Sequence, residues 1–83
     1  MQVIYFAWVR EQIGKSEEKL DVPGDIKTVD DLVNWLAGKG EGYGLAFKDK
    51  SKIRAAVNQT FVGPDHSLKG ADEIAFFPPV TGG

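Results

Sequence analysis

The stretch TVDDLVNWLAGKG, residues 28–40, has the pattern of one amphipathic helix. Apolar residues recur at the spacing i, i+3, i+4 and i+7, which places them in a single stripe along a helix: Val29, Leu32, Val33 and Leu36. Thr28 is placed to cap the amino end, with Asp31 three residues later in a variant of the capping box. Gly38 and Gly40 end the helix, because glycine most easily takes the left-handed conformation of a helix C terminus.

Two strands are predicted before this helix. Residues 2–9, QVIYFAWV, are rich in the β-branched and aromatic types that favour strands. Both alternating faces of this segment are apolar, which indicates an inner strand with one face on the core. The segment REQIGKS then supplies a turn around Gly14, and residues 17–22, EEKLDV, follow as a second strand. Together the two segments predict a hairpin with a loop of several residues.

The segment directly after the helix is harder to assign. Residues 38–52 are rich in glycine and lysine, and neither a helical nor a strand period extends through them. Within this segment, residues 43–47, YGLAF, fit a short helical turn that would add Leu45 and Phe47 to the core.

Three further strands complete the predicted fold. Residues 53–63, IRAAVNQTFVG, predict two short strands about a turn near Asn58 and Gln59, and residues 73–77, EIAFF, predict the last strand. The order is β-β-α-β-β-β, which predicts an α+β domain over residues 1–77: a mixed sheet with one main helix packed on one face. The other sheet face is expected to stay partly open.

The last strand is followed by PPVTGG, residues 78–83. Pro78 and Pro79 lack an amide donor, so strand pairing is expected to stop there and an extended, flexible tail to follow. Fully extended, these residues would project roughly 18–20 Å beyond the sheet. Gly82 and Gly83 keep the tip slim enough for a narrow partner cleft. A terminal glycine pair also occurs by chance, so the proline stem and the fold carry most of the argument.

Composition excludes several classes of protein. With 83 residues there is room for one core, and 42% hydrophobic with 27% charged residues is ordinary for a soluble globular domain. The chain has no cysteine and one histidine, His66, which excludes thiolate chemistry and a His-rich metal site. A net charge of −2 argues against a nucleic-acid binder. No apolar run approaches the ~20 residues of a membrane helix, and no signal peptide is evident, so we expect a cytoplasmic protein.

Two segments resemble the small subunit of bacterial molybdopterin synthases. Residues 55–83, AAVNQTFVGPDHSLKGADEIAFFPPVTGG, are similar to the C-terminal third of that family, and residues 4–14, IYFAWVREQIG, to its first strand and loop. The match is most specific in AAVNQ, GADEIAF and FFPPVTGG, and weakest over residues 38–52. The predicted architecture also resembles the β-grasp fold of ubiquitin.

The resemblance implies a sulfur carrier that is not catalytic alone. In that family an adenylyltransferase resembling the ubiquitin-activating enzyme uses ATP to adenylate the terminal glycine, here Gly83, and sulfur then replaces AMP to give a thiocarboxylate. The tail inserts into the large synthase subunit, which holds the catalytic residues, and gives its sulfur to cyclic pyranopterin monophosphate in molybdenum cofactor biosynthesis. The resemblance further implies a heterotetramer and no cofactor or metal on this chain. The inserting residues would be Pro78, Pro79, Val80, Thr81 and Gly82.

Three phenylalanines predict a docking surface for these partners. Strand alternation turns Phe6 and Phe77 away from the helix, and Phe61 matches a large apolar position of the family. Exposed aromatic residues on an open sheet face usually mark a partner site, although a misjudged register would make them core residues instead. Arg10 fits a pair with an acidic partner residue and equally a solvated loop charge. The basic run of Lys48, Lys50, Lys52 and Arg54 fits a solvated edge strand better than a phosphate site.

Other functions remain open at the level of the sequence. A sulfur carrier for thiamine thiazole synthesis or tRNA thiolation shares the fold and the Gly-Gly end. A modifier conjugated to lysines uses the same activated carboxyl chemistry. A β-grasp interaction module with an inert tail would keep its function when Gly82 and Gly83 are deleted.

Overall fold

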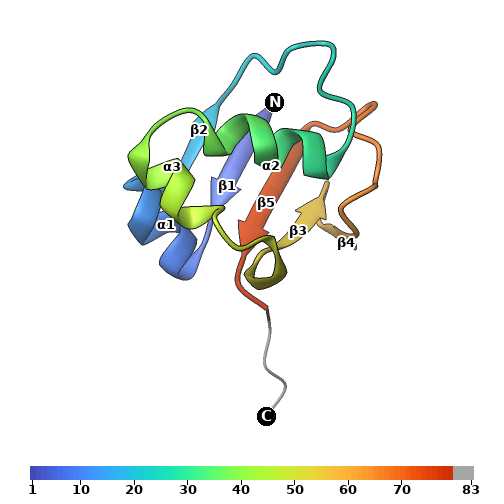
Figure 1. Cartoon of the computed structure of the whole chain (residues 1–83). Helices are drawn as coiled ribbons and strands as arrows, with labels where there is room; N and C mark the ends of the chain where they lie inside the picture. Colours follow the sequence, from blue (N-terminus) through green and yellow to red (C-terminus); the bar gives the residue numbers. More distant parts are fainter. Residues whose placement is uncertain (80–83) are drawn as a thin grey trace.

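The computed structural model describes residues 1–79; residues 80–83 lie outside the described part of the chain. Five strands form one mixed sheet in the order β2-β1-β5-β3-β4 (Figure 1). The central strand β5 runs parallel to β1 and antiparallel to β3. The strands are β1 (Gln2–Tyr5), β2 (Glu17–Lys19), β3 (Arg54–Val57), β4 (Thr60–Val62) and β5 (Glu73–Phe77).

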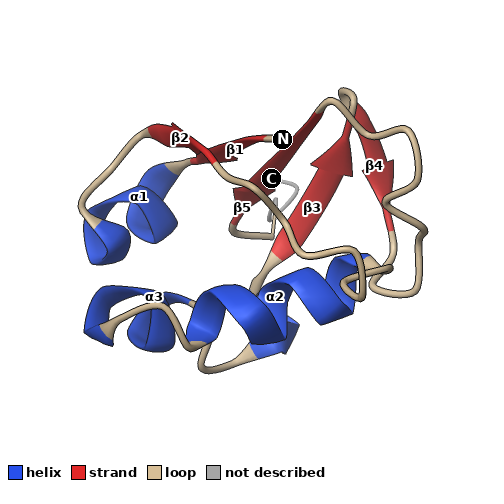
Figure 2. Ribbon diagram, turned by 90° about the horizontal axis from the view of Figure 1, so that it is seen from above, coloured by secondary structure: helices blue, strands red, loops and turns tan. Residues whose placement is uncertain are grey.

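The helices cover one face of this sheet (Figure 2). They are α1 (Ala7–Ile13), α2 (Val29–Ala37), α3 (Glu41–Ala46) and the short 3₁₀ helix η1 (Lys50–Lys52). The predicted α+β fold, a β-grasp with a mixed sheet, is therefore confirmed, and α2 is its longest helix. The two layers meet in a core whose fully buried side chains include Val3, Tyr5, Val9, Leu32, Leu36, Ile74 and Phe76.

Helix α2 forms where the sequence predicts it. The Thr28 hydroxyl accepts a hydrogen bond from the Asp31 N–H at 3.1 Å, and the Asp31 carboxylate accepts one from the Thr28 N–H at 3.2 Å, which completes a capping box. The helix ends at Gly38 as predicted, but Gly38 is right-handed at φ −88° and not left-handed. The predicted apolar stripe is buried: Val29, Leu32, Val33 and Leu36.

The strand predicted over residues 2–9 is wrong beyond Tyr5. Its second half belongs to helix α1, in which Val9 is fully buried. Gly14, expected in a hairpin turn, is the left-handed C-cap of this helix at φ 86°. A short apolar run cannot be assigned to strand or helix by its period alone, and the arginine, glutamate and glutamine that follow favour a helix.

The second predicted strand is present but short. Residues 17–22 were expected to be extended together, whereas β2 covers only the first three of them. Its last residue, Lys19, pairs with Gln2, the first residue of β1, and the next residue, Leu20, still exchanges backbone hydrogen bonds with Met1 at 2.9 and 3.0 Å. The predicted hairpin therefore exists as an antiparallel pair, with α1 in place of an irregular loop.

The segment over residues 38–52 contains α3 and η1. Phe47 enters the core as predicted, with 3% of its surface exposed. Leu45 does not, and remains 53% exposed. Tyr43 is buried instead, because the helical period sets it on the same side as Phe47, four residues later, and turns Leu45 outward.

The β3–β4 turn lies at the predicted residues. Asn58 and Gln59 have φ values of 47° and 70°, as a type I′ hairpin turn requires. The Asn58 side-chain oxygen also accepts hydrogen bonds from the backbone N–H groups of Asp72 at 3.0 Å and Glu73 at 3.1 Å. This side chain therefore holds the hairpin against the start of β5.

Candidate functional site

The predicted tail begins at the end of the central strand. Backbone pairing on β5 extends to its last residues, since the Phe6 N–H donates to the Phe76 carbonyl at 3.0 Å and Arg54 lies opposite Phe77. The strand ends at Phe77, as expected from the missing amide donors of Pro78 and Pro79. The chain then leaves the sheet at the end opposite the N terminus (Figure 1). A strand bonded on both sides thus fixes the base of the tail.

The chemical end of the predicted tail lies outside the described residues. Pro78 and Pro79 are partly exposed beside the body of the protein. The remaining tail residues, Val80, Thr81, Gly82 and the terminal Gly83, are beyond the part of the chain that the structure describes. Their roles in insertion and in carrying sulfur stay predictions.

The three predicted phenylalanines gather on the sheet face that the helices leave open. Phe61 is 74% exposed and Phe6 49% exposed, while Phe77 is half-buried. The Phe61 and Phe77 rings lie 5.2 Å apart between centroids. The register of β1 with β5, continued by one residue, sets Phe6 beside Phe77. We call these residues, Phe6, Phe61 and Phe77, the aromatic patch; its role in docking stays a prediction.

Arg10 lies on α1 and not in a loop as expected from the sequence. Its side chain is exposed, and among residues 1–79 its guanidinium makes no ion pair or side-chain hydrogen bond. The helix places it near the end of β1 from which Phe6 also emerges. Its predicted partner contact stays untested.

A groove beside the tail was not predicted from the sequence. It has a volume of about 540 Å³ and lies between α1, α3 and the proline stem. Sequence reasoning missed it because α1 was predicted as part of a strand and a loop, and α3 only as a short helical turn over residues 43–47. We call it the tail-base groove, and the residues that line it are Trp8, Leu45, Ala46, Lys48, Asp49, Lys52, Pro78 and Pro79.

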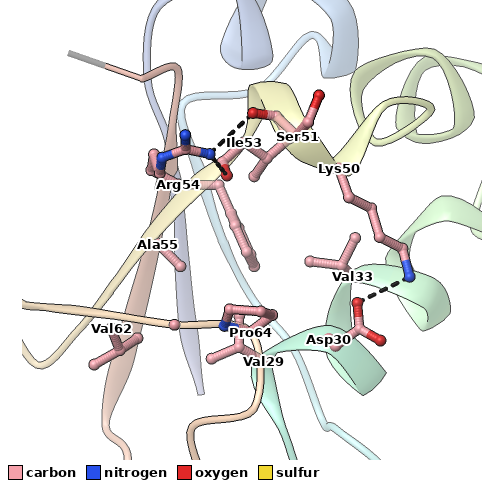
Figure 3. Close-up of a pocket in the computed structure, with 12 residues that line it drawn as sticks. Val29, Asp30, Val33, Lys50, Ser51, Ile53, Arg54, Ala55, Val62 and Pro64 are labelled. Carbon is pink, nitrogen blue, oxygen red and sulfur yellow. Dashed lines mark hydrogen bonds and ion pairs between the residues drawn. The ribbon is translucent and has the colours of Figure 1, made fainter.

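A second cavity, of about 460 Å³, lies between α2 and the β3–β4 hairpin (Figure 3). Its wall is mostly aliphatic, and Figure 3 shows its polar groups engaged with one another or with the backbone. Lys50 pairs with Asp30 at 2.8 Å, and the Arg54 guanidinium donates to the carbonyls of Ser51 and Ile53 at 2.9 and 3.0 Å. This cavity offers packing surface and no arrangement of catalytic groups.

A polar cluster joins β1, β2 and α3. The Glu18 carboxylate accepts hydrogen bonds from the Tyr5 hydroxyl at 2.8 Å and the Tyr43 hydroxyl at 2.6 Å, and Lys15 donates to it at 3.2 Å. Burial, followed by the bond to Glu18, raises the pKa of Tyr5 far above its ordinary value. Burial alone would raise the pKa of Glu18, but the bonds from Tyr43, Tyr5 and Lys15 outweigh it and lower that pKa. The cluster stabilises the fold and contains no free nucleophile.

Within residues 1–79, no group of three or more histidine, cysteine, aspartate or glutamate side chains is placed to hold a metal ion. No helix there is long and apolar enough to cross a membrane.

Comparisons with known proteins match the chain from end to end. The ThiS family model covers residues 3–83. The molybdopterin synthase sulfur carrier subunit of Escherichia coli strain K12 is 46% identical over 83 residues, which cover 100% of this chain and 99% of that protein. The corresponding subunit of Haemophilus influenzae is 42% identical with the same coverage. Among solved structures, small archaeal modifier protein 1 of Haloferax volcanii has a TM-score of 0.71 and 27% identity, covering 96% of this chain and 97% of that one.

Proposed function

The chain belongs to the ThiS family, and we propose that it is the sulfur carrier subunit of a molybdopterin synthase, with the terminal carboxylate of Gly83 as its working group. The observation that carries this proposal is 46% identity over the full chain to a molybdopterin synthase sulfur carrier subunit. The position of the tail at the end of a central strand supports it.

The chemistry follows from the properties of a carboxylate. A carboxylate is a poor electrophile, so an ATP-dependent adenylyltransferase first joins the Gly83 carboxylate to AMP, with loss of pyrophosphate. A sulfur nucleophile then attacks the carbonyl carbon and AMP leaves, which gives a thiocarboxylate. Its sulfur is a nucleophile at neutral pH, so the carrier needs no thiol of its own, and the sequence has no cysteine. ATP binds to the activating enzyme, and this chain holds no cofactor.

The body of the carrier positions this group for its partners. The proline stem leaves β5 with few conformations to lose, which lowers the entropy cost of inserting the tail into a cleft. The large synthase subunit receives the tail and supplies the catalytic residues, in a heterotetramer of two carriers and two large subunits. The aromatic patch contacts the activating enzyme and the large subunit in turn. We expect these steps to take place in the cytoplasm.

The test is reconstitution from purified parts. Chain carrying the thiocarboxylate is mixed with its large subunit and cyclic pyranopterin monophosphate, and the pterin product is followed by mass spectrometry. Each thiocarboxylate carries one sulfur atom and returns to a carboxylate after transfer. We therefore expect the pterin to gain the two sulfur atoms of a dithiolene while two carrier chains are consumed, and chain lacking Gly83 to give no product. A thiocarboxylated chain that leaves the pterin unchanged, beside a relative that converts it, would refute the assignment.

The similarity to a modifier protein favours a second candidate function. In that case the activated Gly83 carboxyl is attacked by a lysine amine of another protein and forms an isopeptide bond. Tryptic peptides in which a lysine carries residues 70–83 of this chain, the piece that trypsin leaves because Lys69 is the last basic residue, would support this candidate when found after expression in the native cell. The same fold also suits a carrier for thiamine thiazole synthesis or tRNA thiolation, which the pterin assay distinguishes.

A further inference from the structure

The tail-base groove lies where a protein that takes up the tail must approach the body. Pro78 and Pro79 form one of its walls, so the groove and the stem are one continuous surface. Only four residues follow Pro79, and their reach is at most roughly 14 Å. A partner whose active site surrounds Gly83 therefore comes within contact distance of the groove.

The groove has an apolar wall that nothing in the described chain covers. Leu45, on α3, is 53% exposed, and Trp8, on α1, is half-buried. Ala46 is buried at the base. An exposed leucine beside a tryptophan is the composition of a contact site for an apolar side chain.

The rim of the groove is basic. Lys48 and Lys52 are exposed, and within residues 1–79 neither makes an ion pair. Lys50, between them in sequence, lines the other cavity and pairs with Asp30 at 2.8 Å. The Asp49 carboxylate is engaged by the backbone N–H and hydroxyl of Ser51 at 3.0 and 2.6 Å. Two cations thus remain available to a partner.

We propose that the tail-base groove docks the large subunit of the synthase, a step that rests on the function proposed above. The docking edge carries an apolar side chain, which packs on Trp8 and Leu45, and carboxylates, which pair with Lys48 and Lys52. The groove belongs to the helical layer, whereas the aromatic patch lies on the open sheet face, so the large subunit contacts the carrier on both sides of the tail base.

Charge reversal tests the basic rim. The variant is Lys48→Glu with Lys52→Glu, and the measurement is the dissociation constant for the large subunit by calorimetry at two salt concentrations. Because like charges facing each other at an interface are strongly unfavourable, we expect binding to weaken at least about tenfold at low salt and the salt dependence to fall. Unchanged circular dichroism and melting temperature check that the variant folds.

A matched control is available at the other end of the molecule. Lys27 and Lys69 are exposed and line a shallow groove beside Met1, at the end of the sheet away from the tail. The double variant Lys27→Glu with Lys69→Glu makes the same change in net charge. We expect it to bind within about twofold of the wild type. If both double variants lose affinity equally, overall charge and not the groove is responsible, and the proposal is wrong.

Tryptophan fluorescence tests the apolar wall of the tail-base groove. In a Trp35→Phe background Trp8 is the only tryptophan, since the chain has two. We expect its fluorescence emission to shift to the blue when the large subunit binds, because docking removes it from water. An unshifted spectrum at saturating large subunit would refute the groove as the contact. If the wild-type chain itself fails to bind the large subunit, the proposed function fails and the docking site with it; binding that survives charge reversal removes only the docking site.

Discussion

At the scale of single residues, Glu18 joins three parts of the fold. Its carboxylate accepts hydrogen bonds from Tyr5 on β1 and Tyr43 on α3, which are 13 and 25 residues away in the sequence. These bonds and the one from Lys15 hold the pKa of Glu18 below its ordinary value, against the effect of burial. A lowered folded-state pKa stabilises the protein above the unfolded pKa, and the contribution is lost as pH falls through the folded value.

Replacing the Glu18 carboxylate by an amide tests whether its charge stabilises the fold. Near neutral pH we expect Glu18→Gln to lower the free energy of unfolding by about 1–2 kcal/mol, since hydrogen bonds to a charged acceptor are replaced by weaker ones. The difference from wild type should shrink as pH falls below about 4.5, the ordinary glutamate value, and vanish below the lowered folded pKa. Urea unfolding of both proteins between pH 7 and pH 3 measures this difference in unfolding free energy. Glu11→Gln, exposed on α1, is the control; a constant difference across this range would contradict the account.

The sequence predicted few of these residue-scale contacts. Alternation correctly turned Phe6 and Phe77 away from the helices, because a strand has a period of two and their neighbours Tyr5 and Phe76 are buried. The partnership of Tyr5, Tyr43 and Glu18 could not be predicted, since it depends on how three elements pack and no local spacing encodes it.

At the scale of elements, α1 and α3 pack closely through Gly42. A Cβ on Gly42 would clash with the Gln12 carbonyl oxygen on α1, which is backbone and cannot turn aside. A Cβ on Gly44, in the same helix, would meet its nearest atom at an ordinary 3.4 Å. The space beside Gly44 thus accepts a side chain, whereas the space beside Gly42 does not.

We expect Gly42→Ala to destabilise the protein by about 1–3 kcal/mol, the usual range for overpacking. Gly44→Ala is the matched control and should be neutral or slightly stabilising, since alanine favours a helix by up to about 1 kcal/mol. Chemical denaturation of the two variants compares them directly. Equal stabilities would show that α1 and α3 are not in close contact.

A second element-scale prediction concerns the β3–β4 turn. Asn58→Ala removes two hydrogen bonds to the start of β5 and leaves a residue with a Cβ at positive φ. We expect a loss of about 1–3 kcal/mol in unfolding free energy. Asn34→Ala, exposed on α2, is the control and should change stability by less than about 0.5 kcal/mol. A similar effect at both positions would contradict the role given to Asn58.

Helices and strands could be predicted where the residues at their ends and the hydrophobic period indicated the same element. The helix α2 has a capping box and a regular stripe, and β5 is followed by two prolines, so both were placed correctly. The short helix α1 was missed because its apolar residues also fit a strand. The helix α3 was predicted only as a short helical turn over residues 43–47, because two of its six residues are glycine. The tail-base groove depends on the packing of α1 beside α3, so it could not be predicted without α1.

At the scale of the whole molecule, the fold holds one strand at the centre of the sheet and extends it into a tail. The tail residues that the sequence pointed to, the proline stem and the glycine pair, therefore follow a strand whose position is fixed in the sheet. The central claim is that the end of this tail carries sulfur to a partner.

Loosening the stem tests whether its stiffness matters. Pro78→Gly with Pro79→Gly increases the freedom that the tail loses on insertion, by about 0.4–1 kcal/mol for each residue. We expect affinity for the large subunit to fall by about four- to thirtyfold, with an unchanged melting temperature because both residues follow the last strand. Pro23→Gly, in an exposed loop, is the control and should leave affinity unchanged. Unaltered affinity in the double variant would show that stem stiffness does not contribute to binding.

The most direct measurement is the intact mass of the chain after co-expression with its activating enzyme and a sulfur source. The account predicts a gain equal to the replacement of one oxygen by sulfur, abolished when Gly83 is deleted. An unchanged mass, with the same enzyme shown to be active on a known carrier, would contradict it and point to an interaction module whose tail is inert.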